Sequence, residues 1–290
     1  MCAPTPAWTT SLTLRRSRTW ERKFGGDYAV SSGQLRKHEQ VRSRFLRNQR
    51  DVIVYLPPGY DDQPWRHFSV LYLHDGQNLF DGATSFIPGQ DWNVGQSADA
   101  AILRGEVEPL IIVGIYNTGK ARIREYTPTR VPKLGGGRAD RYAKFLIEEL
   151  KPSIDGEYRT LSGPQHTGLG GSSLGGLVSL YLGLRLPHIF GRLAALSPSV
   201  WWNQRIMLRF AAGAEVNPRP RIWLDIGTRE GPRIVQDVEQ FRDILLRKGW
   251  QPEQDLHYER VEGAEHNEAA WARRVEPFLR FLFPAGQADV

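Results

Sequence analysis

The chain of 290 residues is long enough to bury roughly 75% of the surface that its unfolded form exposes, which allows one large hydrophobic core. Its residues are 40% hydrophobic, 11% aromatic and 24% charged, a composition typical of globular proteins and unlike that of disordered or fibrous chains. The longest uncharged window, residues 167–184, is rich in glycine and serine. It falls short of the roughly 20 mainly apolar residues of a membrane-spanning helix, so no membrane partner is expected.

The positive charge is concentrated at the N-terminus. Lys and Arg outnumber Asp and Glu by 38 to 32, giving a formal net charge of +6. The first 50 residues alone hold 11 basic and 3 acidic side chains, and the remaining 240 hold 27 and 29, so we expect residues 1–40 to form a basic, solvated extension rather than a nucleic-acid site. Cys2 is the one cysteine, which excludes an internal disulfide and a cysteine-based metal cluster. No secretory signal pattern is visible, so the cytoplasm is the expected location.

Short β-branched runs alternate with segments of helical period along the chain. We expect strands at residues 51–56, 68–73, 110–115, 167–171, 193–196, 221–226 and 256–261. We expect helices at residues 98–103, 138–150, 174–184, 232–248 and 267–283. This alternation predicts an α/β fold with a mostly parallel central sheet and helices on both faces. The catalytic domain is expected to span residues 41–284, followed by a short tail at 285–290.

Ligands of such sheets bind beyond the carboxyl ends of the strands, and one motif satisfies this placement best. Residues 170–176 read Gly-Gly-Ser-Ser-Leu-Gly-Gly and contain Gly-x-Ser-x-Gly with Ser173 at its centre. Between a strand and a helix, small neighbours allow a sharp turn that exposes the serine hydroxyl. A glycine-rich turn used only for close packing is the alternative. The context favours Ser173 as a nucleophile.

A serine nucleophile requires a base, and His266 is the best placed of the seven histidines. It follows Ser173 in the chain and lies directly beyond the last predicted strand. A surface or capping role is the ordinary explanation for a lone histidine, but this position favours a general base.

Five segments together resemble the α/β-hydrolase esterase family that includes the enterochelin (enterobactin) esterases. They are Gly-Ser-Ser-Leu-Gly-Gly at 171–176, Val-Leu-Tyr-Leu-His-Asp-Gly-Gln-Asn-Leu-Phe at 70–80, Val-Ile-Val-Tyr-Leu-Pro-Pro-Gly-Tyr at 52–60, Ser-Pro-Ser-Val-Trp-Trp at 197–202 and Gly-Ala-Glu-His-Asn-Glu-Ala-Ala-Trp at 263–271. Feruloyl and acetyl esterases and S-formylglutathione hydrolases are similar relatives. The resemblance covers about residues 40–283 and implies an α/β-hydrolase fold.

The resemblance implies that Ser173 attacks an ester carbonyl while His266 acts first as general base and then as general acid. The backbone amides of Leu174 and Gln77 would form the oxyanion hole, although Asp75-Gly76 before Gln77 can equally be a simple turn. Two carboxylates could orient the histidine. The family pattern and the chain order favour Glu230, with Asp225 as the alternative.

Aromatic and basic residues near the expected mouth of the site are candidate substrate contacts. They are Trp92, Trp201, Trp202, Arg122 and Arg124. The two adjacent tryptophans could form an aromatic wall for an acyl or sugar group, and the arginines could hold an anionic group. Core packing is the alternative for each tryptophan, and a solvated loop charge is the alternative for each arginine.

These features predict a serine esterase that hydrolyses a small-molecule carboxylic ester through an acyl-serine intermediate, without a metal or an organic cofactor. The ester would be a siderophore, an aromatic acyl ester or a sugar-linked ester. One alternative is an acyltransferase that uses the same triad. The other is a catalytically silent binding protein on a hydrolase fold, which the presence of both Ser173 and His266 disfavours.

Overall fold

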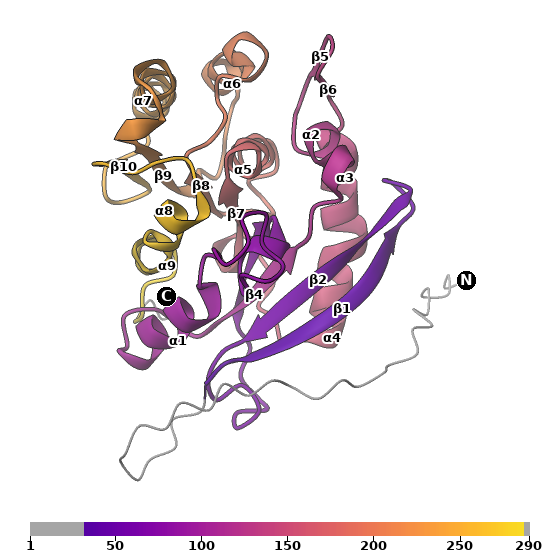
Figure 1. The fold of residues 1–290 in the computed structure, drawn as a ribbon. Coiled ribbons are helices and arrows are strands. Elements are labelled where there is room, and N and C mark those ends of the chain that lie inside the picture. The colour runs from indigo at the N-terminus through magenta and orange to yellow at the C-terminus, as the bar shows by residue number, and fades with distance from the viewer. Residues whose placement is uncertain (1–31, 287–290) are drawn as a thin grey trace.

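The computed structural model describes residues 32–286, and within them eight strands form one sheet in the order β1-β2-β4-β3-β7-β8-β9-β10 (Figure 1). The strands are β1 (Gln34–Ser43), β2 (Asn48–Leu56), β3 (Ser69–His74), β4 (Leu110–Ile115), β7 (Thr167–Ser172), β8 (Arg192–Leu196), β9 (Arg221–Gly227) and β10 (Leu256–Val261). The β1–β2 and β2–β4 pairs are antiparallel, and the remaining neighbours are parallel. A separate hairpin consists of β5 (Arg130–Val131) and β6 (Gly135–Gly136).

Helices cover both faces of this sheet. Alternate residues of its central strands are therefore buried against opposite helix layers. In β3, Val70 and Tyr72 join one hydrophobic cluster while Leu71 and Leu73 join the other. The helices are α1 (Val94–Leu103), α2 (Arg122–Glu125), α3 (Ala139–Phe145), α4 (Lys151–Glu157), α5 (Leu174–Arg185), α6 (Trp202–Gly213), α7 (Pro232–Arg247), α8 (Glu268–Ala272) and α9 (Val275–Leu282). Helices α1 and α9 pack together on one face, and α3 to α7 contribute to the cluster on the other (Figure 1).

The predicted α/β-hydrolase fold class is confirmed, and each of the seven predicted strands is present to within two or three residues. The predicted helix at 138–150 begins as α3 and continues through a π-helical turn, Leu146–Leu150, into α4. The predicted helix at 267–283 is divided into α8 and α9.

Two of the longer elements, β1 and α6, were not predicted, and neither were the short elements α2, β5 and β6. Strand β1 lies at the edge of the sheet, and its charged, half-exposed residues blunt that edge instead of showing a buried strand pattern. The sheet therefore starts at Gln34, and the expected domain boundary at residue 41 falls inside β1. The rest of the expected basic extension, residues 1–31, lies outside the described residues, as do residues 287–290 of the expected tail.

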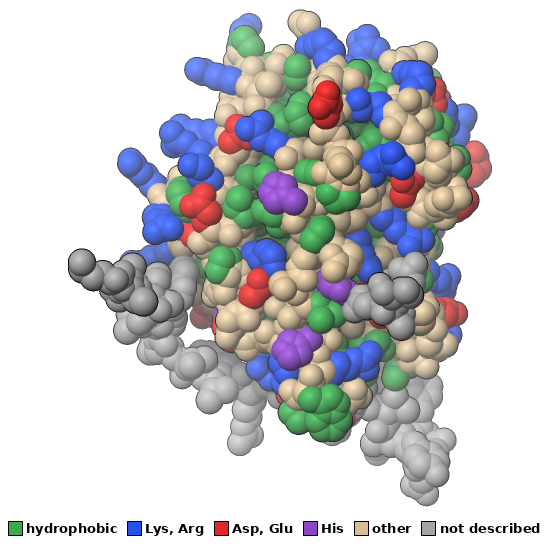
Figure 2. All heavy atoms as spheres, turned by 180° about the vertical axis from the view of Figure 1, so that it is seen from behind, with side chains coloured by type: hydrophobic (Ala, Val, Ile, Leu, Met, Phe, Trp, Pro, Cys, Tyr) green, Lys and Arg blue, Asp and Glu red, His purple; other side chains and the backbone are tan. Residues whose placement is uncertain are grey.

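The surface of the described part mixes charges of both signs. Figure 2 shows basic and acidic side chains interspersed over the face that is turned away in Figure 1. Within residues 32–286, the structure contains no helix that combines the length and the apolar character needed to cross a membrane.

Candidate active site

Ser173 forms the one-residue turn between β7 and α5, at the carboxyl end of a central strand. Its backbone has φ 56° and ψ −120°, a conformation that residues with a side chain rarely adopt. The chain reverses direction within this single residue, because β7 ends at Ser172 and α5 begins at Leu174. The hydroxyl is therefore presented at the carboxyl ends of the strands, where α/β proteins bind their ligands.

Two glycines allow this turn to pack tightly against β3. A Cβ atom at Gly171 would lie 3.1 Å from Cβ of His74, and one at Gly175 would lie 3.2 Å from the same atom. The amide of Leu174 belongs to the first turn of α5, where backbone N–H groups have no acceptor within the helix. That amide is a candidate donor to negative charge that develops near Ser173.

His266 and Glu230 come together from two separate loops. His266 follows β10, and Glu230 ends the 3₁₀ turn Thr228–Glu230 that follows β9. Nδ1 of His266 lies 2.6 Å from Oε2 of Glu230, and the imidazole edge packs against the Trp271 ring. The histidine side chain is 43% exposed, whereas the glutamate side chain is 1% exposed. Because Nδ1 is engaged, Nε2 is the nitrogen available for proton transfer.

The second oxygen of Glu230 is also fully engaged. Oε1 accepts hydrogen bonds from Ser197 Oγ at 2.5 Å and from the Gly227 amide at 2.9 Å. Burial raises the pKa of Glu230, but the hydrogen bonds from His266, Ser197 and Gly227 outweigh burial and hold the pKa below its ordinary value. Glu230 is therefore an ionised carboxylate at neutral pH, fixed at both oxygens.

This environment predicts a pH-dependent contribution to stability. Because folding lowers the pKa of Glu230, its stabilising effect is present above the unfolded-state pKa of about 4.3 and is lost as the pH falls through the folded-state pKa. We expect the free energy of unfolding of the wild type to exceed that of Glu230→Gln by more at about pH 7 than at about pH 3.5. Urea denaturation at both values measures this, and an equal difference at the two would contradict it.

Asp225, the alternative acid, is fully buried in β9 and does not contact His266. Oδ1 accepts from Arg274 Nη1 at 2.6 Å and from the Ser197 amide at 3.0 Å, and Oδ2 accepts from Trp223 Nε1 at 2.8 Å. Burial raises the pKa of Asp225 to about 6, against the opposing effect of Arg274 and the other donors. Of the two acids considered, Glu230 is the one hydrogen-bonded to the histidine.

Ser197 connects the buried ion pair to the Glu230 carboxylate. Its hydroxyl accepts hydrogen bonds from Arg274 Nη1 at 3.0 Å and from Trp271 Nε1 at 3.2 Å, and it donates its own proton to Glu230. Ser197 has φ 44°, a left-handed backbone conformation, directly after β8. A continuous network therefore runs from Asp225 through Arg274, Ser197 and Glu230 to His266.

The Ser173 hydroxyl is hydrogen-bonded to a neighbouring serine. Ser173 Oγ lies 3.3 Å from Ser199 Oγ, and the Ser199 amide donates to the Ser173 carbonyl at 2.9 Å. Among residues 32–286, no hydrogen bond joins Ser173 directly to His266. Catalytic hydrogen bonds of this kind are often long without substrate and shorten in the substrate complex.

The loop after β3 is held rigidly beside the turn. Asp75 has φ 58° and ψ 46°, and its carboxylate accepts two hydrogen bonds from Arg122, at 2.8 and 2.7 Å, and one from Asn117 Nδ2 at 2.7 Å. Gly76 is required here, because a Cβ atom would lie 2.5 Å from the Gly114 carbonyl carbon. The Gln77 side chain accepts from the backbone amide of Asn117 at 3.2 Å, and the backbone amide of Gln77 stays the oxyanion donor that the sequence resemblance implies.

Comparison with known proteins decides the family. The Esterase family model matches residues 43–282 of the chain. The chain belongs to the Esterase family. It is 28% identical to the ferri-bacillibactin esterase BesA of Bacillus subtilis, over 93% of this chain and 98% of BesA. It is 26% identical to the endo-1,4-beta-xylanase/feruloyl esterase of Xylanibacter ruminicola, over 79% of this chain and 29% of that protein.

A solved structure shares the fold. The BES protein from Bacillus cereus matches with a TM-score of 0.67 at 23% identity, over 91% of this chain and 99% of that one. The resemblance predicted from the sequence motifs is thus confirmed, and the protein is a carboxylic ester hydrolase. This finding disfavours the catalytically silent alternative.

Two of the three tryptophans expected at the mouth of the esterase site lie elsewhere. Trp92 is 1% exposed and packs against Trp271 in the core beneath the site. Trp202 is 2% exposed, and its indole N–H donates to the Thr129 carbonyl. The expected substrate contact by Trp92 and the expected place of Trp202 in an aromatic wall are therefore wrong, because both rings fill the interior. Trp201 is 42% exposed and remains a candidate substrate contact.

The two candidate arginines have different surroundings. Arg122 is a quarter exposed and holds the Asp75 loop, so two of its three nitrogens are already engaged. Arg124 is exposed, and its side chain forms no hydrogen bond or ion pair with the described residues. Nor do those residues contain any group of three or more His, Cys, Asp and Glu side chains arranged to hold a metal ion.

Sequence reasoning missed Ser197, Arg274 and Asn117 as supporting residues of the site. Ser197 could have been found, because it directly follows β8 at the carboxyl edge of the sheet, the placement that selected Ser173. Arg274 lies between α8 and α9, and no local pattern shows that it reaches Asp225, 49 residues away in the chain.

Removing the Ser197 hydroxyl should therefore impair catalysis. We expect Ser197→Ala to lower kcat about ten- to hundredfold with a smaller change in KM, because Glu230 and His266 lose a fixed position. Steady-state kinetics measures both parameters. Ser43→Ala is the matched control, since Ser43 is also buried and hydrogen-bonded but lies in β1, far from the site in the chain. Equal kcat in the two variants would contradict the positioning role of Ser197.

Proposed function

We propose that the enzyme is a serine esterase that cleaves a small-molecule carboxylic ester through an acyl-Ser173 intermediate. The observation that carries the proposal is the His266–Glu230 pair at the same sheet edge as the strained Ser173 turn. The chain order, Ser173 then Glu230 then His266, is that of the α/β-hydrolase triad.

The geometry supports the following first half-reaction. His266 Nε2 takes the Ser173 proton as Oγ attacks the ester carbonyl, and the buried Glu230 carboxylate stabilises the resulting imidazolium. The amides of Leu174 and Gln77 stabilise the negative charge on the tetrahedral intermediate. Its collapse breaks the ester C–O bond, and His266 gives its proton to the leaving alcohol.

Water then completes the reaction. His266 deprotonates a water molecule that attacks the acyl-Ser173 carbonyl, a second tetrahedral intermediate forms, and Ser173 leaves with the proton from His266. If an alcohol replaced water in this step, the enzyme would be an acyltransferase. No side chain of the triad would differ between the two reactions.

The substrate we propose is a siderophore ester, an aromatic acyl ester or a sugar-linked ester. BesA is named as a ferri-bacillibactin esterase, and the Xylanibacter protein is named in part as a feruloyl esterase. The exposed ring of Trp201, two residues after Ser199, offers an apolar surface near the nucleophile. We propose no nucleic-acid or membrane partner and a cytoplasmic location.

A substrate panel tests this function. The panel consists of catecholate-lactone, feruloyl, acetyl-sugar, S-formylglutathione and p-nitrophenyl esters. We expect kcat/KM to be highest for the first two classes. Product analysis with added alcohols separates hydrolysis from acyl transfer. Lack of turnover of every ester, or turnover that survives in Ser173→Ala, would overturn the proposal.

A further inference from the structure

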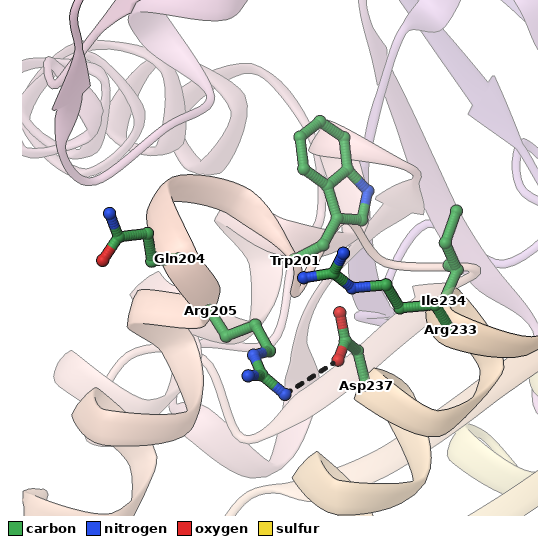
Figure 3. Close-up of a pocket in the computed structure, with 6 residues that line it drawn as sticks. All are labelled: Trp201, Gln204, Arg205, Arg233, Ile234 and Asp237. Atoms are coloured by element: carbon green, nitrogen blue, oxygen red, sulfur yellow. Dashed lines mark hydrogen bonds and ion pairs between the residues drawn. The ribbon is translucent and has the colours of Figure 1, made fainter.

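A pocket of about 530 Å³ lies between α6 and α7 (Figure 3). It is lined by Trp201, Gln204, Arg205, Arg233, Ile234 and Asp237. In Figure 3, the side chains of Trp201, Arg233, Arg205 and Asp237 gather in one hollow between the two helices. The volume is that of a small-ligand site.

Both walls of the pocket continue from segments that carry the triad. Trp201 is two residues after Ser199, whose hydroxyl contacts Ser173. Arg233 and Ile234 lie in the first turn of α7, three and four residues after Glu230. Each wall of the pocket therefore begins within three residues of a side chain that contacts the triad or belongs to it.

The pocket carries an excess of positive charge. Asp237 is nearly fully buried and is paired with Arg205 Nη1 at 3.4 Å. Arg233 is exposed and has no ion-pair or hydrogen-bond partner among residues 32–286. Two arginines against one aspartate leave one net positive charge, and the N-terminal end of α7 adds to the positive potential.

The pocket wall is built on a strained backbone. Asn203, Gln204 and Arg205 have φ values of 45°, 55° and 62°, a left-handed run that costs roughly 1–2 kcal/mol for each residue with a side chain. The Asn203 side chain and the Trp202 indole N–H hold this run by hydrogen bonds to Thr129. Strain of this kind persists when the surroundings enforce it, and it clusters at ligand sites.

We propose that this pocket binds a planar, negatively charged part of the ester substrate. The Trp201 ring stacks on the planar group, and the Arg233 guanidinium pairs with its negative charge. Arg205, held by Asp237, contributes a second positive charge from the opposite side. The kinetic part of this inference rests on the proposed function, whereas ligand binding by the pocket does not.

Matched pairs of esters test the charge preference. On the acyl side, the pair is 4-nitrophenyl benzoate and the same ester with a para-carboxylate on the benzoyl ring. On the alcohol side, the pair is phenyl acetate and 4-carboxyphenyl acetate. In one of the two pairs, we expect Arg233→Gln to lower kcat/KM for the charged member about tenfold, and at least fivefold more than for the neutral member.

Arg247→Gln is the matched control, because Arg247 is an exposed arginine at the opposite end of the same helix. It should change kcat/KM less than twofold for all four esters. The pair in which the charged ester is selectively affected shows whether the acyl or the alcohol part enters the pocket. Equal effects of Arg233→Gln on charged and neutral members of both pairs would overturn the proposal.

A binding measurement separates this inference from the catalytic one. Calorimetric titration of Ser173→Ala with terephthalate should show binding that weakens about tenfold when Arg233→Gln is added. If the wild type hydrolysed no ester but this binding and its loss were observed, the proposed function would fail and the pocket would stand. If esters were hydrolysed but terephthalate bound equally to both proteins, the pocket proposal would fail alone.

Discussion

Replacing Ser173 by alanine is expected to lower kcat by roughly four to six orders of magnitude while leaving the fold intact. The loss is this large because the acyl-enzyme route requires the hydroxyl, and the remaining oxyanion donors supply only the residual rate. The free energy of unfolding should change little. The strained turn keeps its backbone, and the one hydrogen bond that is lost, to Ser199, is long. Steady-state turnover and urea denaturation measure the two quantities.

His266→Ala should cause a loss of similar size, and the double variant should be no worse than either single one. The nucleophile and the base act as one unit, so their contributions are not additive. A His266→Ala variant with more than about a tenth of wild-type activity would show that a different group is the base.

The second large effect is expected at the triad acid. Glu230→Gln keeps the shape of the side chain but should lower kcat by up to roughly 10⁴, because an amide cannot stabilise the imidazolium and can favour the wrong tautomer. Asp225→Asn should lower kcat much less. It should cost stability on the order of 3 kcal/mol, since Arg274 would be left as a buried charge with its ion pair broken.

We expect Glu230→Gln to lose mainly turnover and Asp225→Asn to lose mainly stability, so each variant is the control for the other. Turnover measures the catalytic role, and the midpoint of urea unfolding measures the structural one. An inactive Asp225→Asn protein together with a Glu230→Gln protein that turns over near the wild-type rate would transfer the acid role to Asp225. Ser173 and His266 would keep their roles in that case.

The sequence predicted the central sheet because its strands are buried on both faces and appear as continuous apolar runs, such as Leu110–Ile115. It did not predict β1, whose residues are mostly polar or charged and only partly buried at the sheet edge. Helix α6 was also missed, although Ile206, Met207, Phe210 and Ala211 have helical spacing. Its first turn has left-handed residues that no local propensity indicates.

The sequence-based choice of the triad relied on residues that follow strands of the sheet. Ser173 directly follows β7, whereas Glu230 and His266 lie three and five residues beyond β9 and β10. The structure places Glu230 against His266 as expected, and the catalytic roles of all three stay predictions. The placement of Trp202 failed, because the number of residues past a strand end does not tell whether a side chain turns inward or outward, and Trp92 is likewise buried. The Asp225–Arg274–Ser197 network depends on contacts between residues 28 to 77 positions apart, which only the fold brings together.

The most direct test of the account is the site of labelling by a fluorophosphonate probe, which reacts with an activated serine. Two serine hydroxyls lie 3.3 Å apart here, so the labelled peptide must be resolved to the residue. We expect a single adduct on Ser173, abolished in Ser173→Ala, strongly slowed in His266→Ala and retained in Ser199→Ala. An adduct on Ser199 or on any other serine, or the absence of labelling in the wild type, would contradict Ser173 as the nucleophile.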